Sequence, residues 1–263
     1  MSKIVNENLT VTERIHLGSD IYLFRLAPFT RAGLIKPGQF VHIRIPESNI
    51  YFRRAFSVYD MEPENKTIEI MFKVFGRGTS LLSKLHKGDT LDVLGPLGNG
   101  FKLPSRSERI TLIAGGIGMP PVYLLARKLI DKNYDKSKLI FFYGGVTGAD
   151  LVHMARIRRL GIKLVASTDD GSFGYRGFVT DAVRNETDFR GNKCRIYACG
   201  PEGMLKAVER LATEFRIPGQ LSLEAPMPCG IGICLGCVRP LAAGGHTRVC
   251  RDGPVYDIGE VVL

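Results

Sequence analysis

Short alternating runs of hydrophobic and polar positions dominate the chain from residue 1 to about residue 104. FVHIRI at 40–45 and TIEIMFKVF at 67–75 alternate with a period of two, and turn-forming stretches such as HKGD and GPLGNG separate runs of this kind. Alternation with frequent turns is typical of antiparallel strands that bury one face. We therefore expect an antiparallel β-barrel or sandwich over residues 1–104.

The pattern changes near residue 105. Apolar runs such as ITLIAGGIG, KLIFFYGG, IKLVAST and CRIYACG each end in glycine or a small polar residue, and helical stretches such as PVYLLARKLIDKN and PEGMLKAVERLATEF lie between them. Alternating apolar strands and amphipathic helices predict a parallel sheet covered by helices. We expect this α/β domain to occupy residues 105–219.

A third pattern begins after Gly219, where cysteine, glycine and proline become frequent. The segment 220–263 is too short to bury a core of its own, so it must pack against the rest of the molecule. Taken together, the three patterns predict an α+β multidomain fold.

Composition narrows the setting. No apolar run in the 263 residues approaches the roughly 20 residues of a membrane-spanning helix, so we expect a cytoplasmic protein with no membrane partner. The formal net charge of +10 would suit a nucleic-acid partner, but the basic residues are dispersed and tryptophan is absent. We therefore expect no nucleic-acid partner.

Four of the six cysteines fall in the stretch CGIGICLGCVRPLAAGGHTRVC at 229–250. In a reducing compartment such a cluster binds metal or does redox work more often than it forms disulfides. The spacing Cys229-x4-Cys234-x2-Cys237-x12-Cys250 is typical of a plant-type [2Fe-2S] site, and the glycines between the cysteines let the loop curl around a cluster. A structural zinc site, with His246 as a substitute ligand, and unligated thiols are the alternatives.

Two stretches of the first domain suit a flavin. YFRRAFSVYD at 51–60 places Arg54 where it can pair with a phosphate, and Ser57 where its hydroxyl can reach a flavin ring nitrogen. FKVFGRGTSLLS at 72–83 provides a glycine turn whose backbone N–H groups can approach a pyrophosphate. Taken singly, each stretch also fits a purely structural role: the first as the edge of a strand, the second as an ordinary glycine turn between a strand and a helix.

Two stretches of the second domain suit a nicotinamide nucleotide. ITLIAGGIGMPP at 110–121 is a strand, a glycine turn and a helix start, in which the turn glycines Gly115, Gly116 and Gly118 are candidates for nucleotide binding. YACGPEGM at 197–204 ends a strand at Cys199, whose thiol would lie beside a nicotinamide or would simply be buried.

In this order, RAFS, GRGT, GPLGNGF, AGGIGMPP, CGPEGM and the cysteine segment resemble the ferredoxin–NADP reductase superfamily. CGIGICLGC, VCRDGPVY at 249–256 and TDDGSFGYRGFVTD at 168–181 resemble, within it, the electron-transfer subunits of NAD-dependent dihydroorotate dehydrogenase, essentially from end to end. The resemblance implies an FAD-binding barrel, an NAD-binding domain and a [2Fe-2S] domain.

The resemblance also implies site residues. The implied cluster ligands are Cys229, Cys234, Cys237 and Cys250, and the implied FAD-binding residues are Arg54, Ala55, Phe56, Ser57, Met71, Phe72, Lys73, Gly78 and Thr79. The chain departs from the family in having Ala55 where proline is frequent and AGGIG where a third glycine is frequent. Asp169 and Asp170 stand where NADP-using relatives often carry arginine, and acidic residues would repel a 2′-phosphate, so we expect NAD.

The resemblance finally implies a function. We expect electrons to leave dihydroorotate at the FMN of a separate catalytic subunit and to pass through [2Fe-2S] and FAD to NAD⁺, as a step of pyrimidine biosynthesis in a heterotetramer of two subunits of each kind. The chain alone should not oxidise dihydroorotate, and Cys199 is the candidate for lining the hydride-transfer site. One alternative is a similar subunit of a hydrogenase, sulfide dehydrogenase or transhydrogenase. Another, of a different class, is a zinc-stabilised nucleic-acid-binding module.

Overall fold

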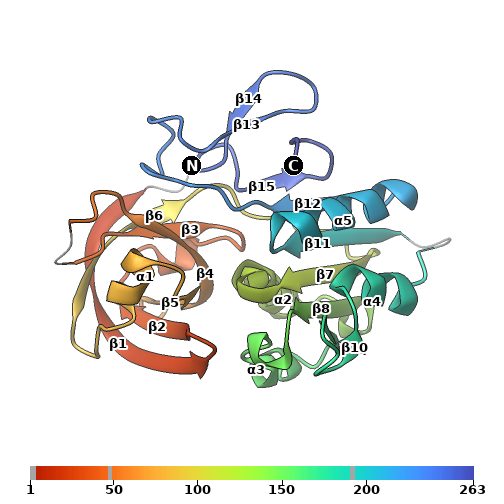
Figure 1. Ribbon diagram of the computed structural model, residues 1–263, viewed down its shortest axis with the longest axis horizontal. Coiled ribbons are helices and arrows are strands. Elements are labelled where there is room, and N and C mark those ends of the chain that lie inside the picture. Colours follow the sequence, from red (N-terminus) through yellow and green to blue (C-terminus); the bar gives the residue numbers. More distant parts are fainter. Residues whose placement is uncertain (1–3, 47–48, 190–192) are drawn as a thin grey trace.

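The computed structural model describes residues 4–46, 49–189 and 193–263. A β-barrel and an α/β domain lie side by side, and the C-terminal segment crosses over both of them (Figure 1). The predicted fold class is confirmed. We keep the division of the chain after residues 104 and 219 as a proposal.

Six antiparallel strands close the barrel in the order β1-β2-β5-β4-β3-β6. They are β1 (Val5–Gly18), β2 (Ile21–Ala27), β3 (Phe40–Ile43), β4 (Arg54–Glu62), β5 (Thr67–Lys73) and β6 (Thr90–Leu97), with a short η1 (Ala32–Leu34) and α1 (Arg77–Leu82) in the connections. Alternate residues of the strands, such as Val41 and Ile43 of β3, fill the interior. The period-two pattern of the sequence thus reflects an inward and an outward face.

The α/β domain is built on a sheet of the order β10-β9-β8-β7-β11-β12-β15. Its parallel strands are β7 (Arg109–Gly115), β8 (Leu139–Gly145), β9 (Lys163–Thr168), β10 (Tyr175–Arg176), β11 (Cys194–Cys199) and β12 (Gly219–Ser222). One strand, β15 (Val255–Asp257), comes from the C-terminal segment and pairs antiparallel with β12. The sheet is therefore mixed at this edge, where the sequence predicted only parallel strands.

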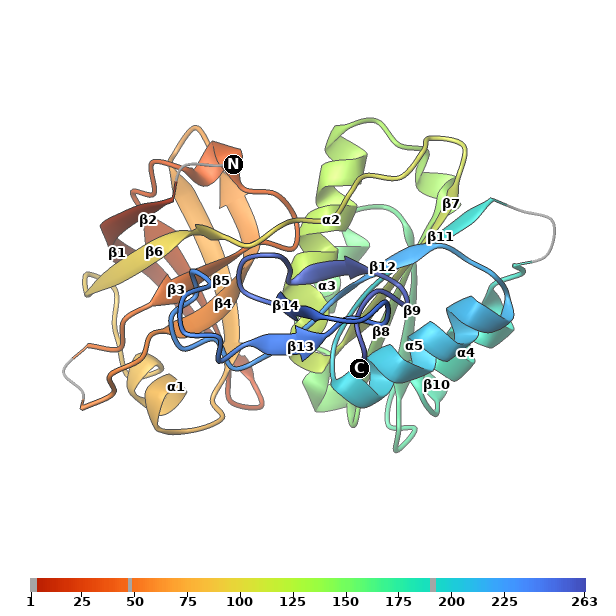
Figure 2. The same cartoon turned by 90° about the horizontal axis from the view of Figure 1, so that it is seen from above.

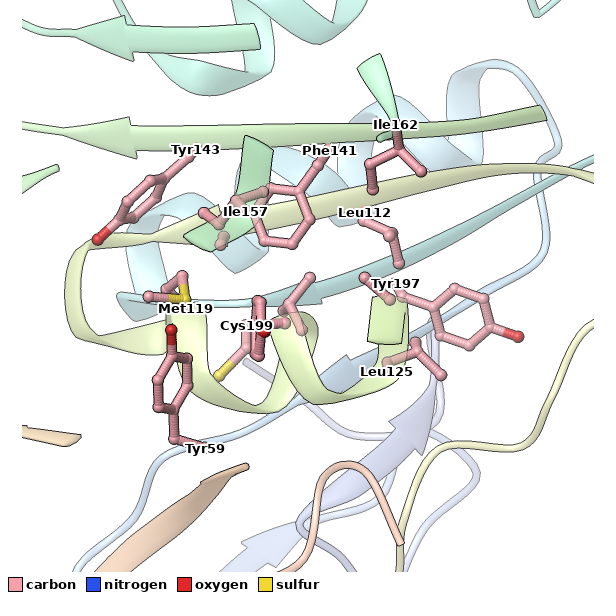
Figure 3. Packing of buried hydrophobic residues seen from close by; sticks show 14 of the residues in the cluster. Tyr59, Leu112, Met119, Leu125, Phe141, Tyr143, Ile157, Ile162, Tyr197 and Cys199 are labelled. Atoms are coloured by element: carbon pink, nitrogen blue, oxygen red, sulfur yellow. The ribbon is translucent and has the colours of Figure 1, made fainter. Parts of the chain in front are cut away.

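Helices cover both faces of this sheet. On one face of the sheet, side chains such as Leu112 and Phe141 pack with α2 (Met119–Asp131) and α3 (Met154–Arg158). Figure 3 shows some of the residues in this apolar cluster. On the opposite face, side chains such as Ile113 and Phe142 pack with α4 (Val179–Glu186) and α5 (Glu202–Glu214). The strands are buried on both faces, which explains their continuous apolar runs. The remaining turns are η2 (Gly116–Gly118), η3 (Lys136–Lys138) and η4 (Gly148–Asp150).

A buried ionic network joins the barrel to the α/β domain. Arg156 of α3 donates to Asp60 of β4 and, at 2.6 Å, to Glu69 of β5, and Arg127 of α2 also donates to Asp60. The two carboxylate side chains are only 4% exposed. Arg156 also lies over the ring of Tyr59, 4.8 Å from its centroid. Because each buried carboxylate has charged partners, the network fixes the helices against the two barrel strands.

The C-terminal segment packs where the two domains meet. It forms a hairpin of β13 (Val238–Pro240) and β14 (His246–Arg248) and then β15, and it lies across the top of both domains (Figure 2). Cys237 and Cys250 share one apolar cluster with Phe40 and Leu97 of the barrel. The segment is thus buried against the two other domains, as expected for a segment too short to form a core of its own. Within the part of the chain that the structure describes, no helix is long and apolar enough to span a membrane.

Candidate functional site

A cavity of about 450 Å³ opens between the barrel and the α/β domain. Its barrel wall is made by the predicted flavin residues Ala55, Phe56 and Ser57 of β4 and Met71, Phe72 and Lys73 of β5. Cys199 lies opposite, at the end of β11. The fold thus brings six of the nine predicted FAD-binding residues to the same cavity as the candidate hydride-site thiol.

The other three predicted flavin residues lie beside this cavity. Gly78 packs against the Arg54 guanidinium, since a Cβ there would lie 3.2 Å from Arg54 Nε. The Thr79 hydroxyl accepts the Phe75 N–H at 2.8 Å and donates to the Gly76 carbonyl. The Thr79 side chain therefore stabilises its own turn. Phe75, in the same turn, also lines the cavity.

The end of β12 and the segment that follows it belong to the cavity but were not predicted from the sequence. Ser222, Glu224 and Met227 line the cavity together with Phe40. The Glu224 side chain is exposed to the open cavity, but the surrounding protein partly removes its carboxyl from water, and this raises its pKa. No motif marks this segment. The signal that could have found it is its position at the carboxyl end of a parallel strand, where α/β sheets bind ligands.

Cys199 is neutral in this setting. Complete burial, with a smaller contribution from Glu224, raises the pKa of its thiol far above the ordinary value, against a hydrogen bond with Ser222 that lowers it. Figure 3 shows the thiol at the end of the sheet beside α2. A neutral thiol is a packing group and a weak hydrogen-bond donor, so ionisation is no part of what Cys199 does here.

The three turn glycines have different surroundings. A Cβ on Gly118 would lie 2.5 Å from the Cys199 carbonyl oxygen, and one on Gly115 would lie 2.6 Å from Met204 Sδ. Both positions are thus occupied by the neighbouring β11–α5 turn. Gly116 has a φ of +50° and nothing within 4 Å of its Cβ position, so it is the glycine that faces open space. Pro120 and Pro121 lie in the first turn of α2, at the helix start that the sequence predicts.

Asp169 and Asp170 follow β9 at the carboxyl edge of the sheet. The Asp170 carboxylate accepts the Ser172 N–H at 2.9 Å and its hydroxyl at 2.6 Å, and these bonds lower the pKa of Asp170. The carboxylate is therefore negative at neutral pH, at the edge where the second ribose of a dinucleotide binds in folds of this kind.

The four C-terminal cysteines approach each other in two pairs, Cys229 with Cys234 and Cys237 with Cys250. The Cys234 N–H points at Cys229 Sγ and the Cys250 N–H at Cys237 Sγ, each at 3.5 Å. Over the described ranges, no three His, Cys, Asp or Glu side chains gather as a single-ion site would require. Two thiol pairs with N–H groups on their sulfurs fit a two-iron cluster, in which each iron takes two thiolates.

The electrostatics of the loop differ between the two pairs. Burial opposes ionisation of Cys229, but N–H groups of Cys234 and Ile231 outweigh it and lower the pKa of Cys229 to about 6. Burial and the neighbouring Cys237 raise the pKa of Cys250 to about 12. Ligation of all four thiolates would therefore have to displace the proton of Cys250.

These three parts define an oxidoreductase with FAD-binding, NAD-binding and iron–sulfur domains. Family models agree: oxidoreductase FAD-binding domain at residues 8–102, oxidoreductase NAD-binding domain at 112–210, and iron–sulfur cluster binding domain of dihydroorotate dehydrogenase B at 224–262. The electron transfer subunit of NAD⁺-dependent dihydroorotate dehydrogenase B from Geobacillus thermodenitrificans is 38% identical, over 99% of this chain and all of its own length, and that from Streptococcus mutans is 36% identical over 99% of both. The chain belongs to this family of electron transfer subunits.

A solved structure extends the comparison. The NADH-dependent reduced ferredoxin–NADP oxidoreductase, studied for flavin-based electron bifurcation, is 30% identical and aligns with a TM-score of 0.83 over 97% of this chain and 89% of its own. The same three-part architecture therefore occurs in a second electron-transfer system.

Proposed function

We propose that this chain carries electrons from a dihydroorotate-oxidising catalytic subunit, through a [2Fe-2S] cluster and FAD, to NAD⁺. The observation that carries the proposal is full-length similarity at 36–38% identity to subunits of this kind, joined to a cysteine loop packed against the flavin cavity. We also place the protein in the cytoplasm, where cysteines stay reduced and available to hold a cluster.

We assign FAD to the cavity between the two domains. When bound there, FAD supplies the conversion between single electrons and hydride. The β4 and β5 residues form the wall, Arg54 provides a cation beside Gly78, and Lys73 holds the wall to the α/β domain through Asp150 at 3.2 Å. These contacts orient the barrel wall toward Cys199.

We assign the four cysteines as the cluster ligands and Cys199, with Glu224, to the nicotinamide side of the cavity. Phe40 lines the flavin cavity and also packs in the apolar cluster that contains Cys237 and Cys250. A route from the cluster to the flavin therefore needs to cross only the outer wall of β3. Asp169 and Asp170 favour NAD over NADP.

The partner site is an apolar surface beside the cysteine loop, formed by exposed side chains and called here the cluster-side surface. Its members are Tyr51, Phe52, Ile231, Ile233 and Leu235. Tyr51 and Phe52 line a hollow together with Cys229. Exposed apolar side chains around a redox centre favour docking of another protein. We propose the FMN-containing catalytic subunit there, in a complex with two subunits of each kind.

The second candidate is a subunit of an electron-bifurcating transhydrogenase, which the similarity to the solved oxidoreductase favours. Coexpression separates the two. The chain should copurify with an FMN-containing α/β-barrel subunit, and the complex should reduce NAD⁺ with dihydroorotate, while neither subunit alone does so. Reduction of NAD⁺ by dihydroorotate with this chain alone, or its absence in the complex, would overturn the assignment. Light scattering of the complex tests the stoichiometry.

A further inference from the structure

His42 stands in the wall between the flavin cavity and the cysteine loop. It lies on the outer face of β3, where Phe40, two residues before it, lines the flavin cavity and Arg44, two residues after it, lines the hollow beside Cys229. Its neighbour across the ladder with β4 is Ala55, another residue of the cavity wall.

The His42 side chain is completely buried, at 0% exposure. Neither Nδ1 nor Nε2 has a hydrogen-bond partner among the residues that the structure describes. A buried polar group without a partner costs on the order of 1–3 kcal/mol, so two such ring nitrogens call for an explanation, such as a redox role or a group that binds there. Burial, with the nearby charges of Arg53 and Arg54, lowers the pKa of His42 to about 4, so the ring is neutral and carries one N–H donor.

The ring lies directly against the cysteine loop. A Cβ on Gly230 would be 2.5 Å from His42 Cε1 and 2.6 Å from Nδ1, so no larger residue fits between the ring and the loop. Gly230 follows Cys229, one of the assigned cluster ligands. The histidine is therefore aimed at the backbone that surrounds the cluster, whereas Phe40 and Ala55 form the flavin side of the wall.

We propose that His42 is a positioning residue of the iron–sulfur centre, whose ring N–H donates a hydrogen bond to a sulfur of the bound cluster. The proposal rests on the proposed function only in requiring that the cysteines hold the cluster. Reduction adds negative charge to the cluster, so a donor to sulfur stabilises the reduced form more than the oxidised form. His42 thus raises the reduction potential at the point where electrons cross toward the flavin.

The first test is a redox titration of the holoprotein, followed by the electron paramagnetic resonance of the cluster and by flavin absorbance. In His42→Leu, the equilibrium constant for one-electron reduction of the cluster should fall about tenfold, which is about 59 mV for a one-electron couple. His42→Gln keeps an N–H donor and should stay within about twofold of the wild type. The flavin couple should not move in either variant. A cluster in His42→Leu with an unchanged potential would overturn the proposal.

A second test looks for the hydrogen bond directly, in the spectrum of the cluster of the wild-type protein. Protein labelled with 15N-histidine is reduced, and pulsed electron paramagnetic resonance is recorded on the cluster of the wild type. We expect a coupling to a histidine nitrogen that disappears in His42→Gln. If the wild-type protein holds the cluster but shows no such coupling, the proposal for His42 is wrong, while the proposed function still stands. If the purified wild type takes up no iron at all, the proposed function fails as well, so the two failures are distinguishable.

Discussion

At the scale of single residues, Gly230 connects the cysteine loop to the barrel. Its φ of +71° and its contact with His42 both disfavour a side chain. Gly230→Ala should therefore lose at least half of its iron and sulfide relative to bound FAD, because the new methyl group would push the loop off the ring. Gly244→Ala is the matched control: its φ of +92° brings a similar backbone cost, about 1–2 kcal/mol, but nothing lies within 4 Å. Equal cluster loss in both variants would contradict this explanation.

Cys199 gives a second prediction at this scale. Cys199→Ala should slow reduction of FAD by NADH about tenfold, or about 1.4 kcal/mol, because the nicotinamide loses a packing surface. Because burial raises the thiol pKa above its ordinary value, the neutral form persists, and the wild-type rate should show no thiol inflection from about pH 6 to about pH 9. Stopped-flow absorbance measures both. Cys194→Ala, at the other end of β11, should leave the rate unchanged.

What the sequence could predict at this scale depends on locality. The cysteine spacing is a local pattern, and the loop closes on itself through Cys229 and Cys234. The candidate cluster ligands could therefore be predicted from the sequence. His42 and Glu224 could not be predicted in this way, because no motif lies near them in the sequence. His42 matters only because Gly230 folds onto it from 188 positions further along the chain.

At the scale of elements, α3 holds the α/β domain on strands β4 and β5, the strands that form the flavin wall. Arg156→Met should lower the free energy of unfolding by about 2–4 kcal/mol, because it removes a partner from two buried carboxylates. Denaturant unfolding of the protein measures this. The control is Arg184→Met, whose pair with Glu214 is about half exposed and which lies over Phe215 in a similar way. Its cost should stay below about 1 kcal/mol, and equal costs would contradict the role of the network.

The elements themselves were largely predictable from periodicity. The runs at 40–45 and 67–75 became β3 and β5, and PVYLLARKLIDKN became most of α2. The mixed edge of the sheet could not be predicted, because β15 is only three residues long and its pairing with β12 comes from tertiary packing rather than from a hydrophobic pattern in the sequence. For the same reason, no sequence pattern indicated that Arg156 would bridge two domains.

At the scale of the whole molecule, the cluster-side surface should decide partner binding. Tyr51 is 92% exposed, and Tyr51→Glu should weaken association with the catalytic subunit at least about tenfold, or about 1.4 kcal/mol, while NADH still reduces the flavin. Leu34→Glu is the control, since η1 packs beside Pro63 at the opposite end of β4. Affinity measured with the purified subunits tests both, and equal weakening would place the interface elsewhere.

The cysteine loop and the flavin cavity should form one electron path open to NADH. The most direct measurement is the visible absorption spectrum of the anaerobically purified protein before and after addition of NADH, with metal analysis of the same sample. We expect the sample to contain iron and to show flavin and iron–sulfur bands, and we expect NADH to bleach both sets of bands. A colourless protein that contains zinc, or a flavin that bleaches while the iron–sulfur bands stay oxidised in the presence of excess NADH, would contradict it.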